Sequence, residues 1–283
     1  MLAQTMPSGC CTAKRPATPK TNHPELSKFY LFKVVPWLGF IMAIWTELAR
    51  ASNIAGDEIL LRQRDDIFEI RYNGLELMSN INFQSETVLA ERSIRLLDTS
   101  PKNVLIGGLG MGFTLRAALD MLTARTSVTV CEFVPEIVDW NRHNIGHLAN
   151  FPLNDPRVNI EVADVMQTLK ASRSSFDLIL MDTDNGPDFL VRNENDAIYA
   201  KEGLSTVINA LRPGGIASFW SATPSHSFEE LLDEMQMSWE RHDVSLISGR
   251  SDAFHFIYFI TKFGGITTPY AAKHHVSPST LAL

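Results

Sequence analysis

The stretch Val104-Leu105-Ile106-Gly107-Gly108-Leu109-Gly110-Met111-Gly112 decides how the rest of the chain is interpreted. Apolar residues run without polar alternation into a glycine-dense turn, and a helix-like segment, 113–122, follows. Such a run is typical of a strand buried on both faces, as in a parallel sheet. Glycines let the backbone approach a ligand, and the amides that open the next helix attract negative or polar groups. The stretch therefore predicts a nucleotide-type cofactor loop or, alternatively, a tight structural turn of another α/β protein.

Composition narrows the class of protein. The 283 residues are 45% hydrophobic and 20% charged, which is typical of a soluble globular protein. The net charge of −7 argues against a nucleic-acid binder with a general basic surface and is compatible with a cationic small molecule. Cys10, Cys11 and Cys131 show neither a disulfide framework nor zinc spacing, so no metal is expected and a reducing, cytoplasmic location is predicted.

The first 45 residues differ from the rest of the chain. They are rich in Pro, Thr, Lys and Ser at the start and are predicted to be disordered or extended. The apolar segment 29–45 is short and interrupted for a membrane span, so no membrane partner is expected. Upstream lysines and Ala49-Arg50-Ala51 mimic a signal peptide, which leaves export as an alternative to the cytoplasm. A further interpretation places the natural start at Met42, with an unstructured extension before it.

A small antiparallel β-unit is predicted over residues 46–82. Two strand-like runs, 58–64 and 67–72, are separated by an Asp-Asp turn, which suits a hairpin. Asn73-Gly74 then gives a second turn signal before the run 75–78.

Strands and helices alternate over residues 83–264, the predicted nucleotide-binding transferase domain. The expected strands are 104–106, 127–131, 158–162, 176–181, 216–220, 241–248 and 253–261. The expected helices are 83–97, 113–122, 204–211 and 228–237, and a further helix is expected to begin at 135. This alternation predicts an α/β fold with a doubly wound, mostly parallel sheet. The last two strands, joined by a short turn, predict one antiparallel strand, and 265–283 is predicted to be a loose tail.

Residues suited to an adenosine-type ligand stand at the ends of four consecutive predicted strands. The first strand ends in the glycine loop, and the next three end at Glu132, Asp164 and Asp182. Ligands of doubly wound sheets bind beyond these carboxyl ends. Glu132 follows the loop by about twenty residues, where an acid accepts hydrogen bonds from ribose hydroxyls. Asp164 is expected to accept from an adenine amine, Asp182 lies nearest the chemistry, and helix capping is the structural alternative for each acid.

Five segments of the chain carry a family resemblance. They are Gly107-Gly108-Leu109-Gly110-Met111-Gly112, Glu132, Ala163-Asp164, Asp182-Thr183-Asp184-Asn185-Gly186-Pro187 and Leu211-Arg212-Pro213-Gly214-Gly215. With the leading β-unit, they resemble the spermidine synthases and their methyltransferase relatives over about 58–263. The resemblance implies an S-adenosylmethionine-dependent methyltransferase type of fold, an adenosyl donor held by Gly107, Gly108, Gly110, Gly112, Glu132 and Asp164, a small amine acceptor and a homodimer.

Departures from the family pattern bear on the reaction. Spermidine synthases have an acid in place of Gly110, understood to hold the terminal amine of decarboxylated S-adenosylmethionine. Bare amides there favour a donor that keeps its carboxylate. The family's Tyr-His-Glu signature stands here as Gln84-Ser85-Glu86, so Glu86 and, more loosely, Gln84 are the substrate-binding candidates. Asp182 carries over as the base or amine-orienting acid, and Asp184 only loosely as its companion.

The predicted reaction moves a methyl or aminopropyl group from S-adenosylmethionine or its decarboxylated form to an amine of a small cationic acceptor such as a polyamine. It needs the amine held in line and an acid that takes or orients its proton. Repulsion between Asp182 and Asp184 is expected to raise one pKa.

Two further expectations and one alternative function complete the sequence-based interpretation. Trp220 either lines the acceptor pocket or packs in the core. His226, His242 and His255 lack ligand spacing and are expected to be structural. The alternative function is a non-catalytic adenosyl-ligand-binding protein derived from this fold.

Overall fold

The computed structural model describes residues 44–52, 56–183, 185–188, 190, 195–246 and 253–261. The predictions for the N-terminal segment up to residue 43, for the tail 265–283 and for Asp184 therefore lie outside the described residues. Among the helices of the described ranges, none is long and apolar enough to cross a membrane.

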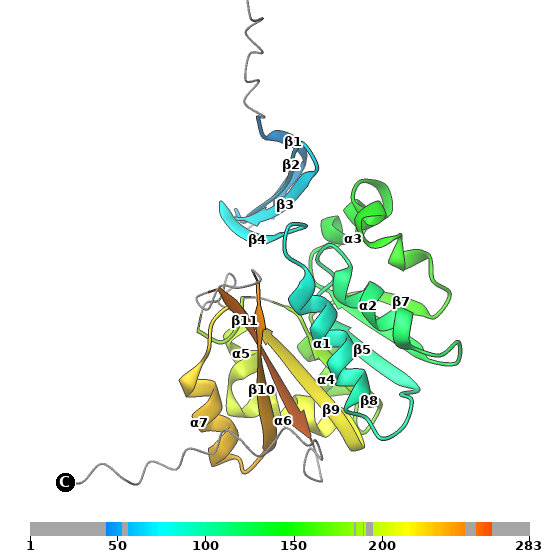
Figure 1. The fold of residues 1–283 in the computed structure, drawn as a ribbon, viewed down its shortest axis with the longest axis vertical. Helices are drawn as coiled ribbons and strands as arrows, with labels where there is room; N and C mark the ends of the chain where they lie inside the picture. Colours follow the sequence, from blue (N-terminus) through cyan, green and yellow to red (C-terminus); the bar gives the residue numbers. More distant parts are fainter. Residues whose placement is uncertain are drawn as a thin grey trace, which may run out of the picture. The chain divides into compact units, whose positions relative to one another are not determined.

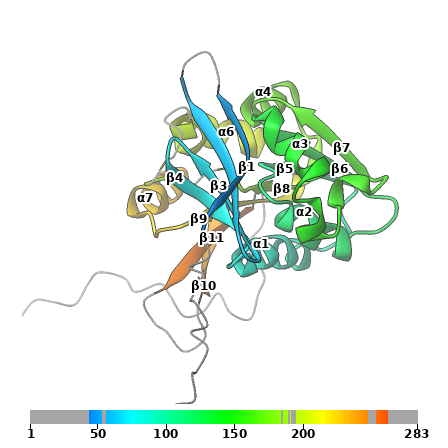
Figure 2. The ribbon, with the colours of Figure 1, turned by 90° about the horizontal axis from the view of Figure 1, so that it is seen from above.

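The first strands form an antiparallel sheet in the order β1-β2-β3-β4 (Figures 1 and 2). Their bounds are β1 Thr46–Ser52, β2 Glu58–Arg64, β3 Ile67–Tyr72 and β4 Leu75–Ser79. Asp65, Asn73 and Gly74 take left-handed backbone conformations in the two predicted turns. The sequence indicated β2 to β4 but not β1, because β1 is an edge strand with largely exposed side chains and no apolar alternation.

The main sheet has the strand order β10-β11-β9-β8-β5-β6-β7. Its bounds are β5 Asn103–Gly107, β6 Ser127–Glu132, β7 Val158–Val162, β8 Phe176–Met181, β9 Leu211–Ser221, β10 Ser238–Ser245 and β11 Phe254–Thr261. The strands β7, β6, β5, β8 and β9 pair in parallel, and β11 is antiparallel to both β9 and β10. The predicted doubly wound sheet with one antiparallel strand is confirmed.

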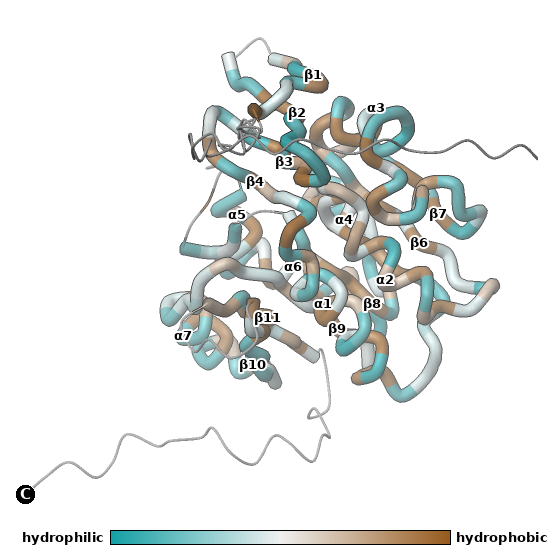
Figure 3. The backbone as a smooth tube through the Cα atoms, turned by 45° about the horizontal axis from the view of Figure 1, so that its top comes forward, coloured by the Kyte–Doolittle hydropathy of each residue, from teal (hydrophilic) through white to brown (hydrophobic). Residues whose placement is uncertain are grey.

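Helices cover both faces of the main sheet. Their bounds are α1 Gln84–Arg95, α2 Phe113–Met121, α3 Pro135–His143, α4 Val165–Ala171, α5 Asp196–Tyr199, α6 Lys201–Ala210 and α7 His226–Glu234. Val104 and Ile106 pack with α1 to α3 and with the small sheet, whereas Leu105 packs with α4 to α7. Successive residues of a strand point to opposite faces, so β5 contributes to both cores. Figure 3 shows hydrophobic segments running through the strands of the main sheet.

Some element boundaries differ from the sequence-based expectation. The helix α4 was not predicted; it is short and begins where the Asp164 side chain accepts a hydrogen bond from the Met166 amide. The strand β10 begins at Ser238 rather than 241 because Trp239 pairs with Ile260 of β11. Neither difference moves the strand ends that carry the candidate residues.

We expect Leu178→Ala to lower the free energy of unfolding by about 2–5 kcal/mol, because it opens a cavity in the middle of β8. Leu178 is completely buried, whereas Leu75 is 50% exposed and provides the matched control. For Leu75→Ala we expect a loss of about 0.5 kcal/mol or less. Urea denaturation of both variants measures the difference, and equal losses would contradict this description of the core.

Candidate functional site

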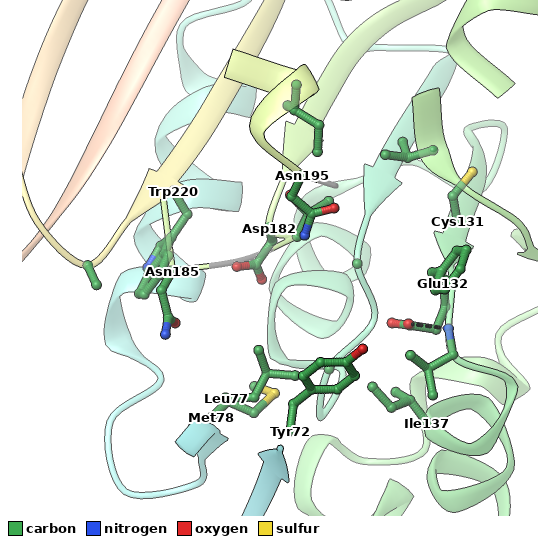
Figure 4. Close-up of a pocket in the computed structure, with 18 of the residues that line it drawn as sticks. Tyr72, Leu77, Met78, Cys131, Glu132, Ile137, Asp182, Asn185, Asn195 and Trp220 are labelled. Atoms are coloured by element: carbon green, nitrogen blue, oxygen red, sulfur yellow. Dashed lines mark hydrogen bonds between the residues drawn. The ribbon is translucent and has the colours of Figure 1, made fainter. Parts of the chain in front are cut away.

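A cavity of about 790 Å³ lies at the carboxyl ends of β5, β6 and β8 (Figure 4). From β5 the chain adds β6 and β7 toward one edge of the sheet and then returns to add β8 on the other side of β5. The order of strands therefore reverses at β5, and doubly wound sheets bind their ligands at this switch point. Tyr72, Leu77 and Met78 of the small sheet project into the same cavity. The site therefore has walls from both sheets.

The glycine loop places backbone against the cavity. Gly108 has a φ of 90°, and a Cβ at this position would overlap the carbonyl oxygen of Asp182. Gly110 has a φ of 51°, and a Cβ there would overlap the Sδ atom of Met78. Both residues line the cavity. Gly107 ends β5 and Gly112 precedes α2, so these two shape the turn from outside the cavity lining.

Glu132 lies at the end of β6, and its buried side chain turns back toward the glycine loop. Its carboxylate accepts hydrogen bonds from the amides of Leu109 at 2.9 Å and Val134 at 2.8 Å. Burial raises the pKa of Glu132, although these amides act in the opposite direction. The carboxylate is thus fixed at the loop and lines the cavity, while its ribose contact stays a prediction.

Asp164 follows β7, where it caps the next helix and also lines the cavity. Its Oδ1 atom accepts a hydrogen bond of 2.9 Å from the Met166 amide, which is the helix cap offered as the structural alternative. The residue also lines the cavity beside Val165. The cap does not use up both carboxylate oxygens, so the predicted adenine contact stays a prediction.

The half-buried Asp182 and the buried Glu86 bring two carboxyl groups into the cavity. The Oδ2 atom of Asp182 accepts a hydrogen bond of 2.6 Å from Thr114 of α2. Burial raises the pKa of Asp182 to about 6, and the charge of Glu132 adds to this shift. Burial likewise raises the pKa of Glu86 to about 7, and the charge of Asp182 adds to it. The repulsion predicted between Asp182 and Asp184 stays a prediction, because Asp184 lies outside the described residues.

The remaining substrate-binding candidates divide into one inside the cavity and one outside. Trp220, at the end of β9, lines the cavity and is also largely buried, so both predicted roles are compatible with its position. Gln84 opens α1 with an exposed side chain and is not part of the cavity lining. The neighbouring Ser85 is buried instead. The substrate contact predicted for Gln84 therefore has no geometric support.

Two of the cavity residues that the sequence analysis did not predict make contacts with the loop or α1. His255, expected to be structural, lines the cavity, and its Nδ1 atom lies 2.8 Å from Ser85 Oγ. Met78 of β4 accepts a weak hydrogen bond of 3.1 Å through Sδ from the Met111 amide. Neither residue belongs to a motif, and each reaches the loop or α1 only through sheet pairing. No spacing signal in the sequence could have identified them.

The cavity lining is rich in acidic residues. Its acidic lining residues are Glu76, Glu86, Glu132, Asp164, Asp182 and Glu202, whereas Lys170 is the lysine or arginine within the described lining. Clustered acids in a low-dielectric cleft attract cations. No group of His, Cys, Asp or Glu in the described ranges is arranged to hold a metal ion. The acids of the lining are suited to attract a cation.

Known proteins resemble this chain in sequence and in fold. Residues 89–240 match the family model described as the spermine/spermidine synthase domain. Polyamine aminopropyltransferase 2 of Pseudomonas aeruginosa is 29% identical over 136 residues, which is 47% of this chain and 37% of that protein. Putrescine N-methyltransferase 4 of Nicotiana tabacum is 34% identical over 121 residues, or 41% and 29% of the two chains. The matched part thus spans roughly a third of these curated relatives.

Solved structures share the fold. The spermidine synthase from Thermotoga maritima superposes with a TM-score of 0.64 at 17% identity, covering 78% of this chain and 74% of that one. A spermidine synthase in complex with the transition state analogue AdoDATO gives a TM-score of 0.66 at 18% identity, covering 78% and 75%.

We expect the contribution of Glu86 to the stability of the protein to fall as the pH rises from 5 to 8. The pKa of Glu86 is raised from 4.5 to about 7 in the fold, so the native state binds more protons than the unfolded chain within this window. Stability from this group is therefore complete below pH 4.5 and is lost as the pH passes about 7. Glu86→Gln should remove part of that decline, on the order of 1–3 kcal/mol.

Urea denaturation at pH 5 and pH 8 measures the decline in the wild type and the variant. Glu91→Gln is the matched control, because Glu91 lies on the same helix and pairs with Arg95 at the surface. A decline that is as large in Glu86→Gln as in the wild type would contradict the raised pKa of Glu86.

Proposed function

Because the chain belongs to the spermine/spermidine synthase family, we propose that it transfers an alkyl group from an S-adenosyl donor to an amine of a small cationic acceptor such as a polyamine. The observation that carries this proposal is the juxtaposition of Asp182 with the buried Glu86 in an acid-rich cavity beside the glycine loop. The location in the cytoplasm and the pairing of two subunits stay predictions.

The donor is proposed to lie along the ends of β5, β6 and β7. Glu132 would accept from the ribose hydroxyls, and Asp164 from the adenine amine, because both carboxylates line the cavity on this side. Cys131 and Ile137 provide apolar surface near Glu132 (Figure 4). The sulfonium group would then lie near Gly108 and Asp182.

The acceptor is proposed to lie between Asp182, Glu86 and Trp220. An ammonium group is not a nucleophile, so its proton must leave before the nitrogen attacks the carbon bound to sulfur. Two carboxyl groups with raised pKa values near neutrality are suited to hold the ammonium and then accept that proton. The attack breaks the carbon–sulfur bond, forms a carbon–nitrogen bond and removes the positive charge from sulfur.

The contact between Met78 and the loop favours S-adenosylmethionine, and so methyl transfer, over the decarboxylated donor. The Met111 amide donates only to a thioether, which is a weak acceptor. A donor carboxylate is a much stronger acceptor for the same amide. An acid in place of Gly110, as aminopropyl transfer with the decarboxylated donor would favour, would overlap Met78.

We expect S-adenosylmethionine to bind at least about 10-fold more tightly than its decarboxylated form, because one charge-assisted hydrogen bond is worth about 1.5–3 kcal/mol. The double variant Gly110→Asp with Met78→Ala makes room for an acid and should reverse this order. Met78→Ala alone is the control for lost packing. Isothermal titration calorimetry measures all three proteins, and a wild-type preference for the decarboxylated donor would contradict the proposed methyl transfer.

We expect Asp182→Asn to lower kcat by at least about 100-fold, because an amide cannot accept the amine proton. The dissociation constant of the donor should change by less than about 3-fold, because Asp182 does not hold the adenosine in this arrangement. Asp120→Asn, on the exposed face of α2, is the matched control.

Mass spectrometry of a polyamine panel incubated with each donor reads the reaction as a gain of one methyl or one aminopropyl group. Full activity of Asp182→Asn would refute its role as base. Donor binding without transfer by the wild type to any acceptor would favour the non-catalytic binding protein.

A further inference from the structure

A chain of short hydrogen bonds leads from Glu86 on α1 to His255 on β11. The Oγ atom of Ser85 lies 2.6 Å from Glu86 Oε2 and 2.8 Å from His255 Nδ1. Ser85 is completely buried and begins α1 next to Glu86, whereas His255 comes from β11. The carboxyl group of Glu86, the hydroxyl group of Ser85 and the imidazole of His255 are therefore connected and can exchange protons.

The proposed reaction creates a need for such a connection. The acceptor enters as an ammonium ion and the product leaves as an ammonium ion, while the sulfonium charge of the donor disappears. Charge balance therefore requires one proton to be released in each turnover. Glu86 is buried on α1, and Asp182 is hydrogen-bonded to Thr114 of α2. With donor and acceptor bound in the cavity, a proton that these two acids accept would need a route out of the site.

We propose that Ser85 and His255 form a proton relay that carries the proton of the acceptor amine away from Glu86. This inference rests on the proposed alkyl transfer. The amine gives its proton to the Asp182–Glu86 pair, Glu86 passes a proton to Ser85 Oγ, and the hydroxyl proton of Ser85 moves to His255 Nδ1. His255 releases its Nε2 proton to water, so one proton enters the relay and one leaves.

The hydrogen-bond directions agree with the end of this step. Ser85 has one hydroxyl proton and donates it to Glu86, so His255 must donate through Nδ1 to Ser85. The imidazole is then neutral with its proton on Nδ1, which is the form left after release from Nε2. After the products leave, one proton enters at Nε2 and one passes back from Nδ1 through Ser85 to Glu86, which releases it to water in the open cavity. The imidazole then has its starting form again.

The surroundings of His255 favour an imidazole that passes a proton on and does not keep it. Burial lowers the pKa of His255 to about 4, so the imidazolium is short-lived at neutral pH. The ring of His255 packs edge-on against Trp220 with centroids 4.6 Å apart, which fixes its orientation. Glu86 and Asp182 face the other end of the relay, and Glu76 lines the same cavity. His255 is partly exposed, which gives its proton access to water.

Other charged groups near this wall are paired with one another. On the outer side of α1, Arg92 binds Glu240 of β10 at 2.9 Å and lies 3.3 Å from His242 Nδ1. His242 is absent from the cavity lining. It is therefore the matched control for His255, being a half-buried histidine on the neighbouring strand with a hydrogen-bond partner on the same helix.

We expect His255→Gln and Ser85→Ala each to lower the single-turnover rate by about 10-fold or more near pH 7, out of the roughly 100-fold to 10,000-fold contributed by acid–base catalysis. The deficit should shrink above about pH 9.5, where solvent base removes the amine proton. The double variant should lose no more than either single variant, since both break one chain. His242→Gln should follow the wild-type pH profile.

The measurement is single-turnover transfer from saturating donor at several pH values, with donor affinity by calorimetry and thermal unfolding as checks on folding. A loss that is equal at every pH, or that multiplies in the double variant, would overturn the relay. Wild-type activity with an unchanged profile in His255→Gln would also overturn it. If the wild type transfers no alkyl group, the proposed function itself fails, so the two failures are distinguishable.

Discussion

The close backbone approach between β5 and β8 is the constraint on which the site depends. The amide of Asp182 donates to the Gly107 carbonyl at 2.8 Å, and the amide of Gly108 donates to the Cys131 carbonyl at 2.8 Å. These bonds extend the parallel pairing of three strands to their last residues. A side chain at Gly108 would overlap the Asp182 carbonyl, so the loop, Glu132 and Asp182 can converge only with glycine there.

Three acids inside the cavity are placed there at a cost in free energy, because no cationic side chain among the described residues pairs with them. Glu86, Glu132 and Asp182 are hydrogen-bonded to hydroxyl groups or backbone amides rather than paired with arginine or lysine in the described residues. Buried carboxyl groups without cations shift toward the protonated form. A bound cation would stabilise the ionised carboxylates and so lower their pKa values again. The stability of the fold and the binding of a cation are therefore expected to depend on the same carboxyl groups.

The sequence predicted the parts of the site that follow from local order along the chain. Parallel strands end at one edge of a sheet, so Glu132, Asp164 and Asp182 could be placed together from strand ends alone. Glu86 was found only through the family resemblance, because it lies on a helix before the first strand of the main sheet. His255 and Met78 depend on the pairing of β11 with β9 and on the packing of the small sheet, which no local pattern encodes. The strand β1 was missed because an exposed edge strand has little apolar signal.

The contact of Met78 with Gly110 also constrains how such a site can diverge. Met78 lies in the small sheet and Gly110 in the loop that follows β5, yet each limits which side chain the other tolerates. An acid acquired first at position 110 meets the sulfur atom, whereas loss of Met78 first leaves a gap against the loop. A change at either position therefore alters the space open to the side chain at the other, so the small sheet and the glycine loop cannot vary independently at this contact.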